Sequence, residues 1–416
     1  MREKRGCGSS GSAQRPGRPP PAGGWRPWGG RQVRVLLAAA ACAGSAAATT
    51  HGAVPEPQIP WSPRVYVCRA ASAAPQIDGR LAAGEWGDAE WTEAFVEIRG
   101  PTAPRPRHRT RVKMLWDAEA FYVAAQLEEP HLWATLTRRD AVIYQDNDFE
   151  VFIDPDGDSH EYYELEINTL GTEWDLLLVR PYRDGGPAVH AWDIPGLRTA
   201  VDLQGTLNDP ADRDEGWSVE IAFPWEALRE CAHTAVPPRG GDRWRVNFSR
   251  VQWSLDVVSG SYRKATDPAT GDPLPEANWV WSPQGLINMH YPEMWGIVEF
   301  VNAPRAIGRE PTGPGAPGTD GVRATTEEER VAWLLRRIYY RQRNLRARTG
   351  NYTADWSVLA LAQPRGWAAA WPPRLARTAH GFVSWVTTGE GRGIAIRTDG
   401  RVWRYEPWGD SAARDR

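Results

Sequence analysis

The 416-residue chain is poor in the residues that carry redox and transition-metal chemistry. It has only 4 cysteines, 4 methionines and 8 histidines. The cysteines form no C-x-x-C or C-x-x-C-H motif, which excludes a zinc ribbon and c-type haem attachment. Cys7 and Cys42 lie in the N-terminal stretch, so Cys68 and Cys231 are the pair left for the folded part. The sequence leaves open whether these two form a disulfide or remain free thiols.

Strong charge and long apolar runs are lacking too. The formal net charge is −3, which argues against a nucleic-acid partner and an anionic membrane surface. The apolar run at 35–48 is too short to span a bilayer, so we expect no integral membrane protein. It follows Arg31 and Arg34 and ends in Ala46-Ala47-Ala48, which predicts a signal peptide and export to the periplasm, cell surface or medium. No G-x-S-x-G, H-E-x-x-H or P-loop motif is present, which argues against those enzyme classes.

Composition divides the chain into five segments. A basic leader with its signal peptide covers 1–50, and a proline-spaced linker covers 51–63. We expect a globular domain at 64–301, a Gly/Pro-rich linker at 302–322 and a small helix-plus-strands appendage at 323–408.

Tryptophan is the residue in excess. There are 23, and fourteen of them lie between Trp61 and Trp295 among many prolines and glycines. Sugars offer apolar C–H faces that stack on aromatic rings, so spare aromatic surface on a β-rich scaffold is typical of carbohydrate binding. The alternative is that tryptophan fills a β-sandwich core.

The stretch 145–178 contains the clearest strand pattern. In 149–154, Phe149, Val151 and Ile153 alternate with Glu150, Phe152 and Asp154 on the other face. Asp-Pro-Asp-Gly at 154–157 is a turn signal. The return strand at 162–168 again places apolar residues on one face, and acidic and amide residues on the other. We expect a hairpin with an oily face and a solvated acidic face.

Similar alternation recurs along the domain at 112–127, 217–223, 244–248 and 295–301, with one short helix near 225–230. Many strands with short turns predict an all-β fold, namely an antiparallel two-sheet β-sandwich of jelly-roll type.

Five blocks carry a family resemblance, in order over about 240 residues. They are PQIDGRLAAGEW, VKMLWDAEAFYVAAQL, QDNDFEVFIDPDG, GWSVEIAFPWEAL and EANWVWSPQGLINMHYPEMWGIVEF. The region from about 64 to 301 resembles the family 9 carbohydrate-binding modules, within the wider DOMON-like β-sandwich group. The resemblance implies an extracellular module that binds a polysaccharide or oligosaccharide and accompanies polysaccharide catabolism. It also implies a sugar held between two aromatic rings, and a structural calcium ion.

Carried onto this sequence, the resemblance points to particular rings. One aromatic position of the family falls on Tyr144, where better-known modules have tryptophan. The other falls on Trp279 or Trp281, and we add Trp174 and Trp192 as further candidates. Hydroxyl partners need amide or charged side chains that bind neighbouring oxygens. The candidates for that role are Asn147, Glu164, Asn168, Arg111 and Arg183.

The hairpin turn is the candidate calcium site. Asp154, Asp156 and Asp158 are spaced like the first three ligands of an EF-hand loop. Ser159 and Leu165 stand where that loop needs glycine and glutamate, so this is no EF-hand. The turn either holds a hard cation through oxygen ligands or is a solvated hairpin tip.

An enzyme is the rival interpretation. Glycosidases need two carboxylates about 5–10 Å apart, and Glu150, Glu164 and Glu166 share one face of the hairpin. We favour a non-catalytic binding protein, because carboxylates on a half-exposed sheet face usually mean only that the face is wet.

The C-terminal segment contains one predicted helix. Thr325 or Thr326 caps it, with Glu328 and Glu329 each three residues on, and Gly350 ends it. Seven arginines lie between Arg330 and Arg348, and we expect them to be solvated or to contact an anionic glycan or the cell envelope.

Overall fold

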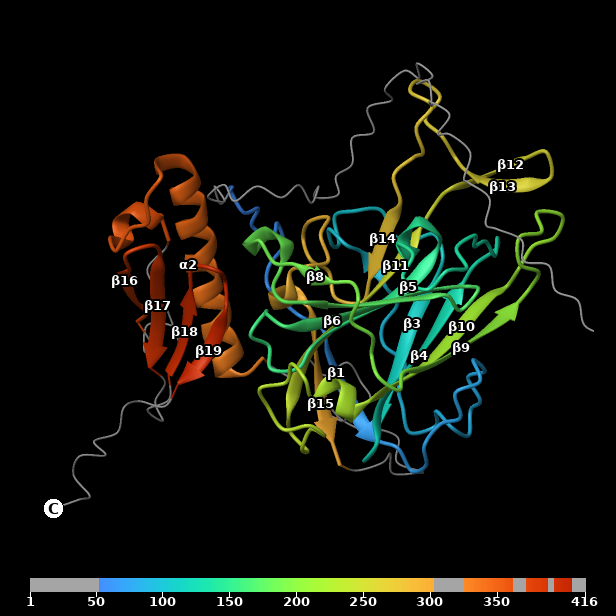
Figure 1. Ribbon diagram of the computed structural model, residues 1–416, viewed down its shortest axis with the longest axis horizontal. Coiled ribbons are helices and arrows are strands. Elements are labelled where there is room, and N and C mark those ends of the chain that lie inside the picture. Colours follow the sequence, from blue (N-terminus) through green and yellow to red (C-terminus); the bar gives the residue numbers. More distant parts are fainter. Residues whose placement is uncertain (1–51, 303–324, 362–371, 388–392, 406–416) are drawn as a thin grey trace, which may run out of the picture. The chain divides into compact units, whose positions relative to one another are not determined.

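The computed structural model describes residues 52–302, 325–361, 372–387 and 393–405. The predicted leader and signal peptide, and nearly all of the predicted linker at 302–322, lie outside these residues. Within them, strands far outnumber helices, which confirms the all-β prediction (Figure 1). None of the helices in these ranges has the length and apolar character needed to cross a membrane.

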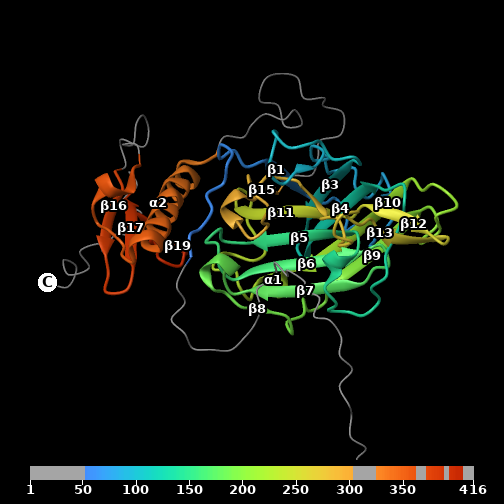
Figure 2. The ribbon, with the colours of Figure 1, turned by 90° about the horizontal axis from the view of Figure 1, so that it is seen from above.

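One large sheet of thirteen strands forms most of the domain. Its strands are β1 (Val65–Ala70), β2 (Val96–Glu97), β3 (Thr110–Trp116), β4 (Ala120–Glu128), β5 (Asp148–Asp154), β6 (Tyr162–Asn168), β7 (Glu173–Leu178), β8 (Ala188–Val189), β9 (Arg198–Gln204), β10 (Gly216–Pro224), β11 (Arg243–Gln252), β14 (Ala277–Val280) and β15 (Gly296–Val301). The main path runs β8-β7-β6-β5-β11-β15-β1-β3-β4-β10-β9, and β14 pairs with β11 and β2. The sheet curls so that its two halves enclose one core, which gives the predicted sandwich (Figures 1 and 2).

The sheet is mixed rather than purely antiparallel as predicted. β1 runs parallel to both of its neighbours, β15 and β3. A strand's own pattern carries no direction, and direction is fixed locally only when a short turn joins two partners. No such turn joins β1 to either neighbour, because β15 lies at the other end of the domain sequence.

The shorter elements complete the description. They are the hairpin β12 (Leu255–Val258) and β13 (Ser261–Lys264), the helix α1 (Trp225–Leu228), and the 3-10 turns η1 (Ile143–Gln145), η2 (Tyr182–Asp184), η3 (Pro292–Met294) and η4 (Trp356–Leu359). The C-terminal segment has α2 (Glu327–Thr349) and the four-stranded sheet of β16 (Arg374–Arg377), β17 (Phe382–Thr387), β18 (Gly393–Arg397) and β19 (Val402–Tyr405).

Tryptophan fills the core more than we expected. Of the fourteen between Trp61 and Trp295, only Trp61, Trp91 and Trp192 are not buried. The main core takes Trp217, Trp244 and other indoles from both halves of the sheet. An indole buries a large apolar area, so a wide sandwich with tryptophan on many inward positions explains most of the excess.

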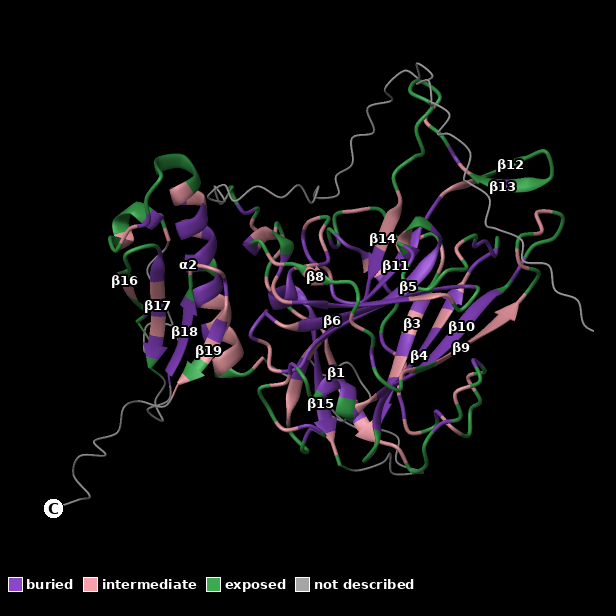
Figure 3. Cartoon of the chain, in the orientation of Figure 1, coloured by how far each residue is buried: buried purple, intermediate pink, exposed green. Residues whose placement is uncertain are grey.

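The helix α2 begins and ends where the sequence predicts. Thr326 and Glu329 form a reciprocal capping box, and Gly350 adopts the left-handed conformation that ends the helix. The buried face of α2 packs on β17 and β18 and shares one core with Val54, Tyr291 and Met294 (Figure 3). Val54 lies in the predicted linker at 51–63, and part of that linker is therefore packed against the fold.

Candidate functional site

The two faces of the β5–β6 hairpin are both covered. The strands pair with Glu150 opposite Glu166 and with Phe152 opposite Glu164. Phe149, Val151 and Ile153 enter the main core as predicted. All residues of both strands are buried, however, so the acidic face is not wet as we expected. A second cluster that includes Ile98, Ile143, Trp174 and Trp295 packs on that face.

Four carboxylates lie on this covered face: Asp148, Glu150, Glu164 and Glu166, here called the strand cluster. They are 0%, 5%, 5% and 2% exposed, respectively. One oxygen from each of Asp148, Glu150 and Glu166 lies within 4.8 Å of the others. Among the described residues, no lysine, arginine or histidine forms an ion pair with the strand cluster.

Burial and mutual repulsion govern the chemistry of the strand cluster. Burial raises the pKa of Asp148, Glu164 and Glu166 well above the usual range, and the charge of Glu150 raises each further. Burial raises the pKa of Glu150 itself to about 7. These side chains have too little exposed surface to reach a glycosidic bond, so the structure gives no support to paired catalytic carboxylates on this hairpin.

An aromatic pair lies beside the strand cluster. Tyr144, in η1, is half-buried, and its ring centroid is 6.4 Å from that of Trp174 on β7. The Tyr144 N–H donates to Glu166 Oε2 at 2.8 Å, and its carbonyl accepts from Trp253 Nε1 at 2.9 Å. The Trp174 ring also stacks on the exposed His190, with centroids 5.5 Å apart. The backbone of Tyr144 is therefore fixed from two sides while part of its ring stays accessible.

The structure places the other predicted rings away from this pair. Trp279 and Trp281 are only 3% and 2% exposed and belong to the main core. Trp281 packs on Phe248 and covers Gly296, so its ring has no free face. Because a buried ring cannot stack on a sugar, neither indole enters the site we propose. Trp192 is half-buried and donates to Glu230, apart from the strand cluster.

Two predicted amides are engaged in the fold. Asn147 donates to Glu129 and accepts from the Trp253 N–H. Asn168 is fully buried, donates to Asp146 Oδ2 and the Leu136 carbonyl, and accepts from two backbone N–H groups of the following turn. Both amides position the loop before β5 rather than face solvent.

Arg111 lies in the other half of the sheet. It donates to Gln126 across the β3–β4 pair and lies over the Trp91 ring at 4.0 Å. Glu164 is thus the one predicted polar partner that belongs to the strand cluster, although Glu166, not Glu164, contacts Tyr144 and pairs opposite Trp174.

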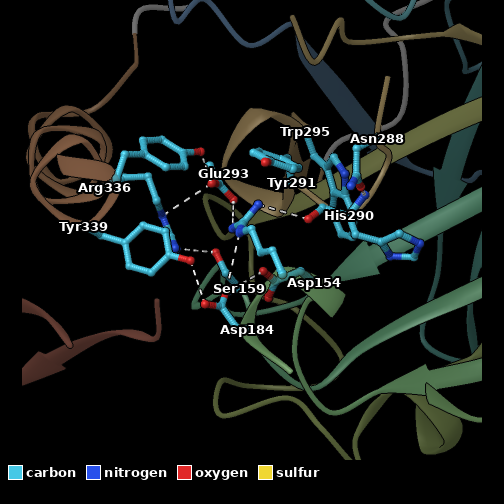
Figure 4. Close-up of polar contacts among 12 residues, drawn as sticks. Asp154, Ser159, Asp184, Asn288, His290, Tyr291, Glu293, Trp295, Arg336 and Tyr339 are labelled. Atoms are coloured by element: carbon cyan, nitrogen blue, oxygen red, sulfur yellow. Dashed lines mark hydrogen bonds and ion pairs between the residues drawn. The ribbon is translucent and has the colours of Figure 1, made fainter. Parts of the chain in front are cut away.

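Arg183 belongs to a buried network that joins α2 to the sandwich, here called the arginine network. Figure 4 labels its members Asp184, Glu293, Arg336 and Tyr339. Its Nη2 is 2.8 Å from Glu293 Oε2, and its guanidinium lies over the Tyr291 ring. Arg336 of α2 approaches the other Glu293 oxygen at 3.7 Å and donates to Ser159 at 2.7 Å.

The rest of the arginine network centres on Asp184. Arg343 of α2 pairs with Asp184, which also accepts from Tyr339 at 2.6 Å. Tyr340 donates to Glu293 in the same way. Arg336 and Arg343 are fully buried, which corrects our expectation that the arginines of this helix are solvated.

The acidic turn of Asp154, Asp156 and Asp158 is already supplied with donors. Asp154 accepts from the N–H groups of Gly157 and Ser159, and Asp158 accepts from His160. Arg401 also donates to Asp158 at 2.7 Å. Three carboxylate oxygens still lie within 4.8 Å of one another, so calcium at this turn stays a prediction.

Sequence reasoning missed Asp148 and Ser249 and did not foresee the burial of Glu150 and Glu166. The alternation of the strand could have revealed Asp148, because it lies two residues before Glu150 and therefore on the same face. Ser249 lies opposite Glu150 on β11, and only the pairing of distant strands reveals it. Cys68 and Cys231, left open above, are both free and buried.

One segment of the chain matches a known protein family. Residues 77–237 match the family described as carbohydrate family 9 binding domain-like. This part of the chain is therefore similar to the family 9 carbohydrate-binding modules. The matched segment contains Tyr144, Trp174 and the strand cluster, and ends before β11.

Solved structures similar to this module include two of a family 9 carbohydrate-binding module from Caldicellulosiruptor kristjanssonii. The complex with cellotriose has 17% identity and a TM-score of 0.38, and covers 60% of this chain and 100% of that one. The complex with glucose has 18% identity and a TM-score of 0.37, and covers 59% and 100%. A candidate carbohydrate-binding protein from Bacteroides uniformis has 18% identity and a TM-score of 0.42, and covers 57% and 100%. No curated protein matches the chain.

Proposed function

We propose that this module binds carbohydrate on the half-buried ring of Tyr144, which lies against the buried ring of Trp174, without catalysis. The observation that carries the proposal is that the family 9 match covers the segment in which a half-exposed tyrosine ring lies against a second aromatic ring. A pyranose ring stacks its C–H face on such a surface, and nearby polar groups orient its hydroxyls.

Export and a role in polysaccharide breakdown belong to the same proposal. The apolar run at 35–48 after two arginines supports export. The glycan is then a polysaccharide or oligosaccharide outside the cytoplasm, which this protein binds while a partner enzyme cleaves it.

Affinity electrophoresis in gels that contain soluble polysaccharides tests the proposal. We expect retardation by at least one glycan with no release of reducing sugar. Tyr144→Ala removes the stacking ring and should weaken binding about 3- to 10-fold, which corresponds to about 0.5–1.5 kcal/mol.

Tyr182→Ala is the matched control, because Tyr182 is an exposed tyrosine that contacts His290 instead. Its affinity should equal that of the wild type. Unchanged affinity in Tyr144→Ala would move the site elsewhere, and no binding to any glycan would overturn the function.

A further inference from the structure

The four-stranded sheet of the C-terminal segment has two faces of different character. The face toward α2 carries Val386, Ile394 and Val402, which belong to the core that the sheet shares with the helix. Side chains alternate along a strand, so the residues next to these point to the opposite face. That face, here called the outer face, includes Arg374, Val383, Trp385, Ala395, Arg397 and Trp403.

One row of directly paired residues crosses the outer face. Arg374 of β16 pairs with Trp385 of β17, which pairs in turn with Ala395 of β18. Ala395 pairs with Trp403 of β19. Paired side chains share a face and neighbouring strands lie about 4.8 Å apart, so the backbones of the two tryptophans are about 10 Å apart. With only the methyl group of Ala395 between them, the two indoles form an aromatic platform.

Both indoles of the platform are accessible. Each is half-buried, and neither has a ring contact or a side-chain hydrogen bond with another described residue. Other half-buried indoles are engaged in the fold: Trp61 stacks on Trp333, and Trp192 donates to Glu230. A large apolar ring with an accessible N–H is typical of binding surfaces.

A cavity of about 370 Å³ opens beside Trp403. Its walls include Val383 and Arg397 of the outer face and Arg180 of the sandwich. Arg397 donates to Asp399, whereas Arg180 has no hydrogen bond or ion pair among the described residues, and its Nε is buried. A guanidinium without an acceptor favours an anionic ligand, because a carboxylate can accept two parallel N–H bonds from it.

The charges at the two ends of the row favour an acidic glycan over other occupants. Arg374 is exposed and forms no ion pair among the described residues, so an unpaired arginine lies at each end of the platform. A symmetric dimer through this face would place the unpaired arginines of two copies in one interface, which like-charge repulsion opposes. The net charge of −3 argues against nucleic acid. A sugar offers C–H faces to the indoles, and an acidic sugar adds the anion.

We propose that the outer face is a second carbohydrate-binding site, which takes an acidic glycan. Sugar rings stack on Trp385 and Trp403, and a carboxylate of the glycan pairs with Arg180 in the cavity. The strands that carry the platform lie outside the segment 77–237 that matches the family, and the ring of Tyr144 is not part of this site. The second site therefore does not depend on the proposed function.

Affinity electrophoresis in gels that contain alginate or polygalacturonate tests the proposal, with the carboxyl-reduced form of each polymer as the neutral counterpart. At least one polyuronate should retard the wild type, and its neutral counterpart should retard it less. Trp385→Ala and Trp403→Ala should each weaken polyuronate binding about 3- to 10-fold. Trp91→Ala is the matched control, because Trp91 is a half-buried indole of the large sheet, and should bind like the wild type.

Arg180→Gln gives a second test that does not disturb the platform. It should weaken binding of the polyuronate about 10-fold and leave binding of the neutral counterpart unchanged. Because Arg180 has no partner among the described residues, its melting temperature should equal that of the wild type. Unchanged affinity in both Arg180→Gln and Trp403→Ala would overturn the proposal, and so would a wild type that neither polyuronate retards.

The remaining outcomes separate this site from other occupants. Tyr144→Ala should keep full polyuronate binding, and a loss there would move the acidic glycan to the site of the proposed function and refute the second one. Tighter binding of an oligothymidylate than of either polyuronate would assign the platform to nucleic acid. A wild-type dimer in light scattering that becomes a monomer in Trp403→Ala would assign the face to a second copy. Either result would overturn the proposal.

Discussion

Two groups of buried carboxylates in this protein have opposite electrostatics. In the strand cluster, burial raises the pKa of Glu150 to about 7, and no arginine or lysine among the described residues pairs with it. In the arginine network, burial alone would raise the pKa of Glu293, but Arg183 and Arg336 outweigh it and lower that pKa to about 2. Both glutamates are almost inaccessible to solvent.

The difference shows that burial does not fix the charge of a carboxylate. Glu293 lies beside two arginines and accepts the Tyr340 hydroxyl, all of which favour its ionised form, so it acts as a structural anion between α2 and the sandwich. Glu150 has only other acids and the Ser249 hydroxyl across the sheet, so its protonated form is favoured. The arginine network, with its fixed counter-charges, therefore has a structural role. The strand cluster, which has none among the described residues, belongs to the candidate functional site.

The largest effect should come from Glu293→Gln. This change leaves Arg183 and Arg336 buried without their shared anion, which typically costs about 3–5 kcal/mol. Urea unfolding at pH 7 measures the loss. Glu226→Gln is the control, since its ion pair with Arg229 is 86% exposed on the glutamate side and should change stability by less than about 0.5 kcal/mol. A loss below about 1 kcal/mol in Glu293→Gln would mean that the network adds little.

The next largest effect should appear in the pH dependence of the stability difference between the wild type and Glu293→Gln. A folded pKa of about 2 lies below the ordinary value of 4.5. Glu293 therefore contributes stability that is complete above about pH 5 and is lost as pH falls toward 2, because the unfolded chain takes up the proton first. The stability difference between wild type and Glu293→Gln should shrink by about 3 kcal/mol over that window. Other acids titrate in both proteins and cancel, so a constant difference would contradict the assignment.

The sequence predicts what depends on local periodicity. Alternation placed Phe149, Val151 and Ile153 in the core, and the capping box and Gly350 bounded α2. Both signals need only neighbouring residues, because a strand repeats every two residues and a helix end is set by its own first and last turns.

What the sequence does not predict depends on which distant segment covers a face. Trp279 and Trp281 alternate with Val280, and both faces of β14 are covered, so the pattern alone does not say that the indoles point inward. Arginines on a helix are usually solvated, and the local sequence does not show that Arg336 and Arg343 pair with the distant Glu293 and Asp184. The candidate site was therefore found only in part: Tyr144 and Trp174 are brought together, whereas Ser249 lies opposite Glu150 only through the pairing of β11 with β5.

The smallest effect should come from Asp158→Asn in the acidic turn. The electrostatics of this turn are intermediate between those of the strand cluster and those of the arginine network. Burial and then the charge of Asp156 raise the pKa of Asp158 to about 6, although Arg401 opposes both. The substitution loses the partly exposed pair with Arg401 and also relieves repulsion within the turn. These contributions nearly cancel, so we expect a free energy of unfolding within about 1 kcal/mol of the wild type. A loss as large as that of Glu293→Gln would show that the side chain of Asp158 stabilises the contact between the sandwich and β19. The backbone carbonyl of Asp158 belongs to the same contact, where it accepts the Val402 N–H.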